Sequence, residues 1–265
     1  MKKLTVLIAG LIILIPSLAY SDMMTIRLGY YMPYSFSNSY LSSHPNSLFA
    51  IELNQMSFQA SDFRGSILGV GYEFFLTRQL SFAISADFFS HETGGFYKDW
   101  VGISLNTTGF QGEYAFPYPT FSGQYEIQHS MSVSMYPVQF SLKFTPLGRK
   151  TRIIPYVGGG AGVYFLNVAV RGEMPDFSAG QVYTDPLQGN VTVYPVMLVD
   201  AHGTRVVLGG HAFAGIMVPI SYRLTLEAEA RYHYATANFH AFPASDYGPI
   251  NLSGLSISIG INYWF

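Results

Sequence analysis

The last eleven residues, LSISIGINYWF (residues 255–265), are the most informative stretch of this sequence. Successive side chains of a β-strand point to opposite faces, so the odd positions from Leu255 to Phe265 form one wholly apolar row. The even positions carry small or polar residues, with Trp264 as the exception. The stretch therefore predicts a strand with one face against apolar surroundings and the other against polar ones.

The N-terminus predicts a secretory signal peptide. Lys2 and Lys3 precede an apolar run over residues 4–15, and small residues within 19–21 suit signal peptidase. We therefore divide the chain into a signal peptide (residues 1–21) and a mature domain (residues 22–265). An uncleaved anchor is the alternative, although the run is shorter than the roughly 20 residues that span a bilayer. No cysteine follows the signal, so a lipoprotein anchor is not expected.

The composition does not resemble that of a soluble domain. Charged residues make up 11% of the sequence, against roughly 25% in an ordinary soluble domain. Tyr and Phe number 20 and 21. The net charge of −2 becomes −4 without the two lysines of the signal, so nothing favours a nucleic-acid partner. Because the chain has no cysteine, we expect neither a disulfide nor a thiolate metal site.

Period-2 alternation recurs along the mature chain, with connections that are alternately long and short. We predict strands at residues 26–32, 67–76, 80–89, 129–144, 153–171, 204–220, 224–235 and 255–265. In residues 224–235 the alternation is clearest, because Glu227, Glu229 and Arg231 share one face and apolar residues fill the other. In residues 129–144 the apolar row changes phase near Tyr136 and Pro137, which we interpret as a β-bulge.

This layout predicts an all-β fold: an eight-stranded antiparallel up-and-down transmembrane β-barrel with long outer loops and short periplasmic turns. Each strand is about long enough to cross a bilayer obliquely, and closure satisfies the backbone hydrogen bonds without water. The alternative is a soluble barrel with its apolar side inward. The charges gathered on one face of residues 224–235 argue against that alternative.

Three segments carry a resemblance to a known group of proteins: PYVGGGAG (residues 155–162), LTRQLS (residues 76–81) and YWF (residues 263–265). With them the chain resembles the small eight-stranded bacterial outer-membrane barrels, the OmpA/OmpX/OmpW-like set and the related porin-family β-barrel domain. The resemblance covers nearly all of the mature chain. It implies location in the bacterial outer membrane with periplasmic termini and contact with outer-membrane lipids. It also implies recognition of the last strand, through Tyr263 and Phe265, by the barrel-insertion machinery. Such motifs specify a fold and no reaction.

Placing the polar faces inside the barrel collects a network of polar side chains in the lumen. Its predicted members are Arg27, Glu73, Asp87, Gln139, Lys143, Asn167, Arg171, Arg205, His211, Glu227, Glu229, Arg231 and His233. Five cations face four anions, and an eight-stranded barrel is just wide enough for its own side chains. We therefore favour a mutually paired filling, since an unpaired buried ion costs several kcal/mol. A narrow polar path for small solutes or ions is the alternative.

Other candidate sites have less support. Two neighbouring pairs could serve acyl-transfer or protease chemistry at the outer rim: His91 with Glu92, and His129 with Ser130. Neither pair has the spacing of the known barrel enzymes. Three histidines fall in separate outer loops, without the spacing of a metal site: His44, His202 and His240. The glycines of residues 158–162 lack the Gly-Lys-Ser/Thr of a phosphate loop, and we interpret them as packing positions. We expect no catalytic residue, no cofactor and no metal.

Aromatic residues are dense in the predicted outer loop over residues 96–125. They either pack the loop onto the rim, which we favour, or form a contact surface for a partner. Further aromatic residues are predicted in the interfacial girdles: Tyr30, Tyr72, Tyr156, Tyr164, Tyr232, Tyr234, Tyr263 and Phe265. Trp264 should point inward and help to close the floor of the barrel.

The sequence thus predicts a non-enzymatic integral outer-membrane barrel with a structural, surface-contact or envelope-integrity role. The alternative is a narrow channel for small or hydrophobic solutes, which a lateral opening or a dry apolar pocket under the outer loops would favour. An enzyme that modifies outer-leaflet lipid is the third hypothesis, and a His and a Ser converging at the rim would favour it.

Overall fold

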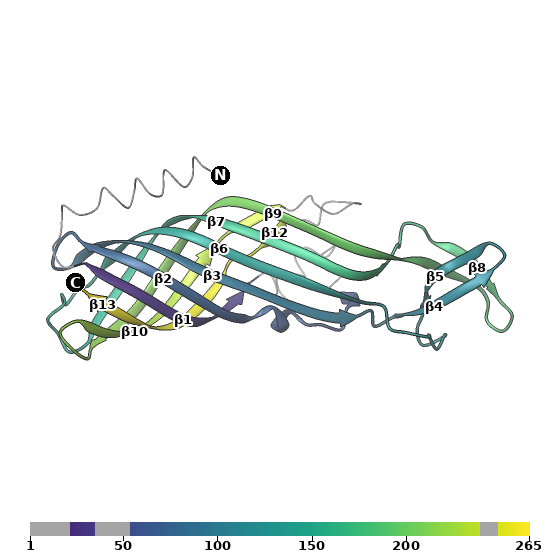
Figure 1. Ribbon diagram of the computed structural model, residues 1–265, viewed down its shortest axis with the longest axis horizontal. Coiled ribbons are helices and arrows are strands. Elements are labelled where there is room, and N and C mark those ends of the chain that lie inside the picture. The colour runs from purple at the N-terminus through teal and green to yellow at the C-terminus, as the bar shows by residue number, and fades with distance from the viewer. Residues whose placement is uncertain (1–21, 35–53, 239–248) are drawn as a thin grey trace.

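Eight strands close into a ring in the computed structural model, which describes residues 22–34, 54–238 and 249–265. The predicted signal peptide, His44 and His240 lie outside these residues. The ring strands are β1 (Met23–Pro33), β2 (Gly65–Phe75), β3 (Leu80–Phe96), β6 (Gln128–Phe144), β7 (Ile154–Pro175), β9 (Gly189–Pro219), β10 (Leu224–Tyr234) and β13 (Gly254–Trp264). All pairs are antiparallel, and β13 closes the ring between β1 and β10 (Figure 1). The predicted eight-stranded barrel is confirmed.

The barrel has two unlike ends. Short turns join β2 to β3, β6 to β7 and β9 to β10 at one end, which we call the turn end. At the other, the loop end, β3, β6, β7 and β9 run on beyond their neighbours (Figure 1). A four-residue 3-10 turn, η1 (Ala60–Phe63), precedes β2, and no helix of the described residues is long and apolar enough to cross a membrane.

Regular structure also occupies segments predicted to be loops, and this prediction was wrong in part. The loop end carries the hairpin β4 (Trp100–Thr107) and β5 (Phe110–Pro117), the strand β8 (Gln181–Asp185), and the small pair β11 (Thr236–Asn238) and β12 (Pro249–Asn251). The physical reason is that pairing continues above the membrane, where lipid no longer imposes an apolar row. Period-2 alternation is therefore weak there although the ladders persist.

The outer face of the ring is apolar. In β10 and β13 exposed residues alternate strictly with buried ones, apart from Trp264, and the exposed row of β13 is Leu255, Ile257, Ile259, Ile261 and Tyr263. The charged side chains of β10, which are Glu227, Glu229 and Arg231, lie on the buried, lumen-facing row. A closed ring with such an exterior is built to face lipid, because every strand hydrogen bond is satisfied within the wall.

The predicted β-bulge at Tyr136 and Pro137 does not exist. The β6–β7 register runs without a slip from His129 opposite Gly172 to Phe144 opposite Val157. On the other side, β3 and β6 are unpaired only around Pro137, and the register is the same before and after the gap. Proline has no N–H to donate, so the ladder is interrupted locally but not shifted. The apolar residues Met131, Val133 and Met135 therefore lie in the lumen.

The lumen is filled in three layers. An apolar floor at the turn end contains Met23, Phe75, Ile154, Tyr156, Phe213 and Met217, with Trp264 packed against them. The middle layer holds the charged side chains described below. Toward the loop end follows an apolar layer with members such as Tyr31, Phe89, Met135, Leu166, Val168 and Val170, covered by Met56, Phe58 and Phe63 from the segment that precedes β2.

The glycines of β7 lie where lumen side chains cross the strand. Gly158, Gly160 and Gly162 are on its inward row, between Tyr156 and Tyr164. A Cβ on Gly160 would come within 1.9 Å of the backbone oxygen of Phe140. The cluster is thus a packing device of the barrel wall and no phosphate loop.

Replacing Gly160 with alanine should therefore lower the free energy of unfolding by about 1–3 kcal/mol, the usual cost of overpacking a filled interior. The obstructing atom belongs to the backbone of the adjacent strand β6 and cannot rotate away as a side chain could. The matched control is Gly210→Ala, where the nearest atom is 3.5 Å away. Urea titration of both variants refolded into lipid vesicles measures the difference, and equal losses would contradict this account of the glycines.

Candidate functional site

Four charged side chains from β1, β3 and β10 interlock at the centre of the lumen. Arg27 lies 3.1 Å from Asp87 and 3.7 Å from Glu229. Arg231 lies 2.9 Å from Glu229 and 3.5 Å from Asp87. Each cation thus meets both carboxylates, and all four side chains are buried. This closed alternation of charges satisfies each ion within the lumen, as a buried network requires.

A second ion pair lies nearer the floor. Lys143 Nζ is 3.0 Å from Glu73 Oε2, and 3.9 Å from the centre of the Tyr156 ring. Ser81 donates a further hydrogen bond to Glu73. Lys143 is therefore held by a carboxylate and an aromatic face together.

Neutral groups complete the layer. Glu227 accepts hydrogen bonds from the Tyr156 hydroxyl at 2.6 Å and the Asn262 amide at 2.7 Å. The Gln139 side chain links Ser85 and Arg231 to Tyr164 and His233. His211 reaches across Gly160 to Ser141, with 2.7 Å between Nε2 and Oγ. Apart from the separate pair of Ser141 and His211, the polar groups thus form a connected network from β1 around to β13.

The structure brings ten of the thirteen predicted lumen residues together inside the barrel: Arg27, Glu73, Asp87, Gln139, Lys143, His211, Glu227, Glu229, Arg231 and His233. Arg205 is on the inward row of β9 but higher up and only half-buried. Asn167 and Arg171 were placed wrongly. Both belong to the outward row of β7, where Asn167 bonds Thr204 and Arg171 pairs with Asp200 on the surface.

The prediction assigned the wrong face of β7 to the lumen, because both rows of the strand are largely apolar within the membrane. Tyr156 and Tyr164 do not join a girdle but lie in the lumen with their hydroxyls bonded. Beyond Phe165 the strand leaves the apolar band, so polar side chains on its outer row meet water. The inward row of Tyr residues and glycines was the available signal, since a buried tyrosine combines apolar area with a hydrogen-bonding group. The neutral members Ser85, Ser141, Ser256 and Asn262 were left out of the predicted network, although the alternation places them on the polar rows.

Little space remains within the charged layer. Two small cavities there have volumes of about 20 and 10 Å³. A cavity needs roughly 10–15 Å³ to hold one water molecule. Neither space connects the two mouths as a water-filled path would.

The floor is closed at the turn end by aromatic stacking. Trp264 points inward, as predicted, and its ring lies 5.2 Å from that of Phe75 at an interplanar angle of 11°. Its Nε1 donates to Thr225 at 2.7 Å. The guanidinium of Arg149 lies 3.6 Å from the centre of the Phe75 ring and covers the stack from below. Cation–π attraction to the stacked rings therefore holds Arg149 against the floor.

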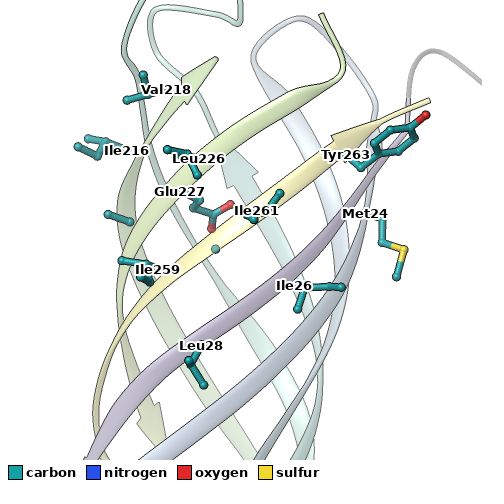
Figure 2. A pocket seen from close by; sticks show the side chains of 12 residues that line it. Met24, Ile26, Leu28, Ile216, Val218, Leu226, Glu227, Ile259, Ile261 and Tyr263 are labelled. Atoms are coloured by element: carbon teal, nitrogen blue, oxygen red, sulfur yellow. The ribbon is translucent and has the colours of Figure 1, made fainter. Parts of the chain in front are cut away.

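The outer wall carries a shallow apolar groove of about 710 Å³ across β9, β10, β13 and β1 (Figure 2). Larger side chains such as Ile216, Leu226, Ile259 and Ile261 surround the small residues Ala228 and Gly260. The strand ladders beneath it are continuous, so the groove is a dent in the lipid-facing surface and no opening through the wall.

The hairpins of the loop end have an apolar core of their own. Tyr114, Phe116 and Val193 are buried there, with Phe110, Phe121 and Tyr183 packed around them. Trp100 packs against Tyr194 and Phe177, whose ring centres lie 5.1 and 5.5 Å away. The aromatic loop is thus packed, as favoured from the sequence, although Tyr118 stays exposed.

The candidate catalytic pairs are not brought together. His129 lies on the inward row of β6 among Phe58 and Tyr97, whereas Ser130 is on the outward row. His91 and Glu92 likewise occupy opposite faces of β3, as consecutive strand residues must. His202 is exposed on β9, and the described residues contain no group of three or more potential metal ligands.

Several solved structures of outer-membrane proteins are similar to this chain at low sequence identity. Neisserial surface protein A is 10% identical over 93% of this chain and 98% of its own, with a TM-score of 0.42. The outer membrane protein OprG from Pseudomonas aeruginosa is 8% identical over 92% and 95%, with a TM-score of 0.46. A major outer membrane protein from Thermus thermophilus is 9% identical over 93% and 100%, with a TM-score of 0.45. The chain is similar to small bacterial outer-membrane barrels. No protein-family model and no curated protein sequence matches it.

Proposed function

We propose that this protein is a non-enzymatic outer-membrane barrel with a closed lumen, which serves the cell surface through contacts made at its loop end. The loop end then faces the cell exterior, and the turn end and both termini face the periplasm. The observation that carries the proposal is the filled lumen: the ion pairs of Arg27, Lys143 and Arg231 are packed between two apolar layers. Because side chains fill the interior and leave no path for a solute, we infer that the protein functions through its outer surfaces.

The loop end supports a contact role. The extensions of β6, β7 and β9 continue into β5 and β4 as one sheet, and β4, β5, β8 and β9 share an apolar core, which orders this surface before any partner binds. Its described residues include nine carboxylates: Asp62, Glu92, Asp99, Glu113, Glu126, Glu173, Asp176, Asp185 and Asp200. Four cations accompany them: Arg64, Lys98, Arg171 and Arg205. This excess of negative charge favours a basic partner surface.

Purified protein inserted into planar bilayers should show no steady conductance. The charged layer leaves spaces of only about 20 and 10 Å³, too small for a hydrated path. Single-channel recording at moderate salt tests this, with a general porin inserted in parallel as the positive control. Long-lived openings with a linear current–voltage relation would overturn the closed lumen.

A second candidate, a path for small hydrophobic solutes, draws on the apolar layer toward the loop end. Val133, Leu166 and Val168 are fully buried in that half of the lumen, so an apolar molecule would enter by displacing part of their packing. The charged layer stands below it, so such a solute would have to leave sideways. Uptake of an apolar solute into vesicles containing the protein, without any ion conductance, would favour this candidate.

A further inference from the structure

The turn end of the barrel is strongly basic. Its three turns carry the cations Arg78, Arg149, Lys150, Arg152 and Arg223. Within the described residues, none of them takes part in an ion pair. Among the described residues, Asp22 is the one acidic side chain at the rim of the turn end, and it accepts a hydrogen bond from Tyr72 at 2.7 Å. The rim therefore presents positive charge that the described chain does not neutralise.

Three of these cations line a pocket of about 490 Å³. Arg78, Arg149 and Lys150 supply its charge. Apolar surface comes from Leu147, Ile154, Pro219, Tyr222 and Trp264. A pocket with cations beside apolar walls suits a ligand that is itself anionic at one end and apolar at the other.

The pocket is organised before any ligand arrives. The Arg149 guanidinium donates to the Thr77 carbonyl at 2.9 Å while it stacks on the Phe75 ring. The two turns that carry Arg78 and Arg149 are tied by the backbone of Thr145, which donates to the Gln79 carbonyl at 2.7 Å. Gly148 closes the second turn with a φ of +66°, a left-handed conformation that favours glycine. A fixed arrangement of donors lowers the ordering cost of binding.

Arg149 has an electrostatic reason to accept an anion. Burial beneath the turn lowers the pKa of its guanidinium, and Glu73 opposes that change. The group nevertheless stays protonated, because arginine is not deprotonated in proteins. A cation that has lost part of its hydration gains more from a nearby anion than a fully solvated one.

We propose that this pocket binds the phosphate of an anionic phospholipid headgroup. Arginine matches phosphate with two parallel hydrogen bonds, and Lys150 adds a third cation. The pocket lies directly beneath the floor of the lumen, because Ile154 and Trp264 belong to both. Its depth is that of the interfacial Tyr263, which precedes Trp264 and whose hydroxyl accepts from Arg223 at 3.1 Å, so the pocket lies at headgroup level. The lipid glycerol and chains then lie against Leu147, Pro219 and Tyr222. Free phosphate presents the same oxygen atoms to these cations, and a titration with inorganic phosphate distinguishes it from the lipid.

The pocket contains its own reporter. The chain has two tryptophans, and Trp100→Phe leaves Trp264, which lines the pocket, as the single emitter. We would titrate this full-length variant in a non-ionic detergent with short-chain phosphatidylglycerol, short-chain phosphatidylcholine and inorganic phosphate. Phosphatidylglycerol should change the Trp264 emission saturably, and phosphatidylcholine should need at least a tenfold higher concentration.

Arg78→Gln with Lys150→Gln should weaken phosphatidylglycerol binding at least tenfold, whereas Arg171→Gln at the loop end should leave it unchanged. Arg149 is kept because it also covers the floor, and a heat-shift gel checks that each variant is folded. Equal binding of both lipids, or an unaffected double variant, would overturn the proposal. Saturation by inorganic phosphate at the same concentration as phosphatidylglycerol would overturn the lipid as source and assign the pocket to free phosphate.

Discussion

Replacing Lys143 with methionine should lower the free energy of unfolding by about 3–5 kcal/mol, the usual cost of breaking a buried ion pair. Lys143 and Glu73 are 3.0 Å apart, and each side chain is 5% exposed. Methionine preserves the length of the side chain but removes the charge, so Glu73 is left as a buried carboxylate without its cation. The measurement is urea titration of the protein refolded into vesicles, followed by tryptophan fluorescence.

Two further variants make that result specific. Adding Glu73→Gln to Lys143→Met should restore most of the loss, because neither partner is then a lone ion. Arg171→Met breaks a pair of similar length, 3.1 Å to Asp200, whose side chains are 66% and 72% exposed. That change should cost only about 0–1 kcal/mol, as exposed pairs do. Equal losses for Lys143→Met and Arg171→Met would show that the charged layer is hydrated and not a dry filling.

The strand count and the closure of the ring were predictable because lipid imposes a strict rule on one face of each strand. In β10 the outward Leu224, Leu226 and Ala228 alternate with Thr225, Glu227 and Glu229, so a period of two fixes both the strand and its inner face. The short turns followed from the same pattern, since each strand had to end where its apolar row ended. Most of the charged layer came with it.

The inner face was not predictable where both rows of a strand are apolar. In β6 the residues Met131, Val133 and Met135 were assigned to lipid because they are apolar, and a bulge was needed to reconcile them with Gln139 and Lys143. In fact the loop-end half of the lumen is apolar. Which row points inward is decided by the register against the neighbours, such as Pro137 opposite Tyr164, and no single strand reveals that register.

The structure of the loop end depends on contacts between segments that are distant in sequence. Tyr114 and Ala115 of β5 pair with Pro195 and Tyr194 of β9, about 80 residues further along. No local period announces such a pairing. The density of aromatic residues did indicate a packed element, but not the strands that it packs. The basic pocket at the turn end was missed for the same reason, because its cations come from two separate turns.

Replacing Ala228 with arginine should destabilise the inserted barrel by about 2–4 kcal/mol, the cost of a cation at the bilayer midplane. Ala228 faces outward, opposite Ile259 of β13 and Ile216 of β9. On the same row of β10, Leu224 lies opposite Tyr263 at one interface, while Tyr232 and Tyr234 mark the other, so Ala228 is midway between the girdles. The free energy of unfolding in vesicles gives the size of the effect.

The depth dependence is the sharper test of the membrane position. Leu224→Arg, four residues nearer the turn end, should cost only about 0–1 kcal/mol, because the cost falls toward the interfaces. Leu187→Arg, in the exposed turn between β8 and β9, removes the same kind of side chain outside the membrane and should have no effect on insertion. An equal cost at positions 224 and 228 would show that the bilayer midplane lies nearer the turn end than Ala228 does. A cost confined to position 228 fixes the apolar band where the row of β13 places it, from Leu255 to Tyr263.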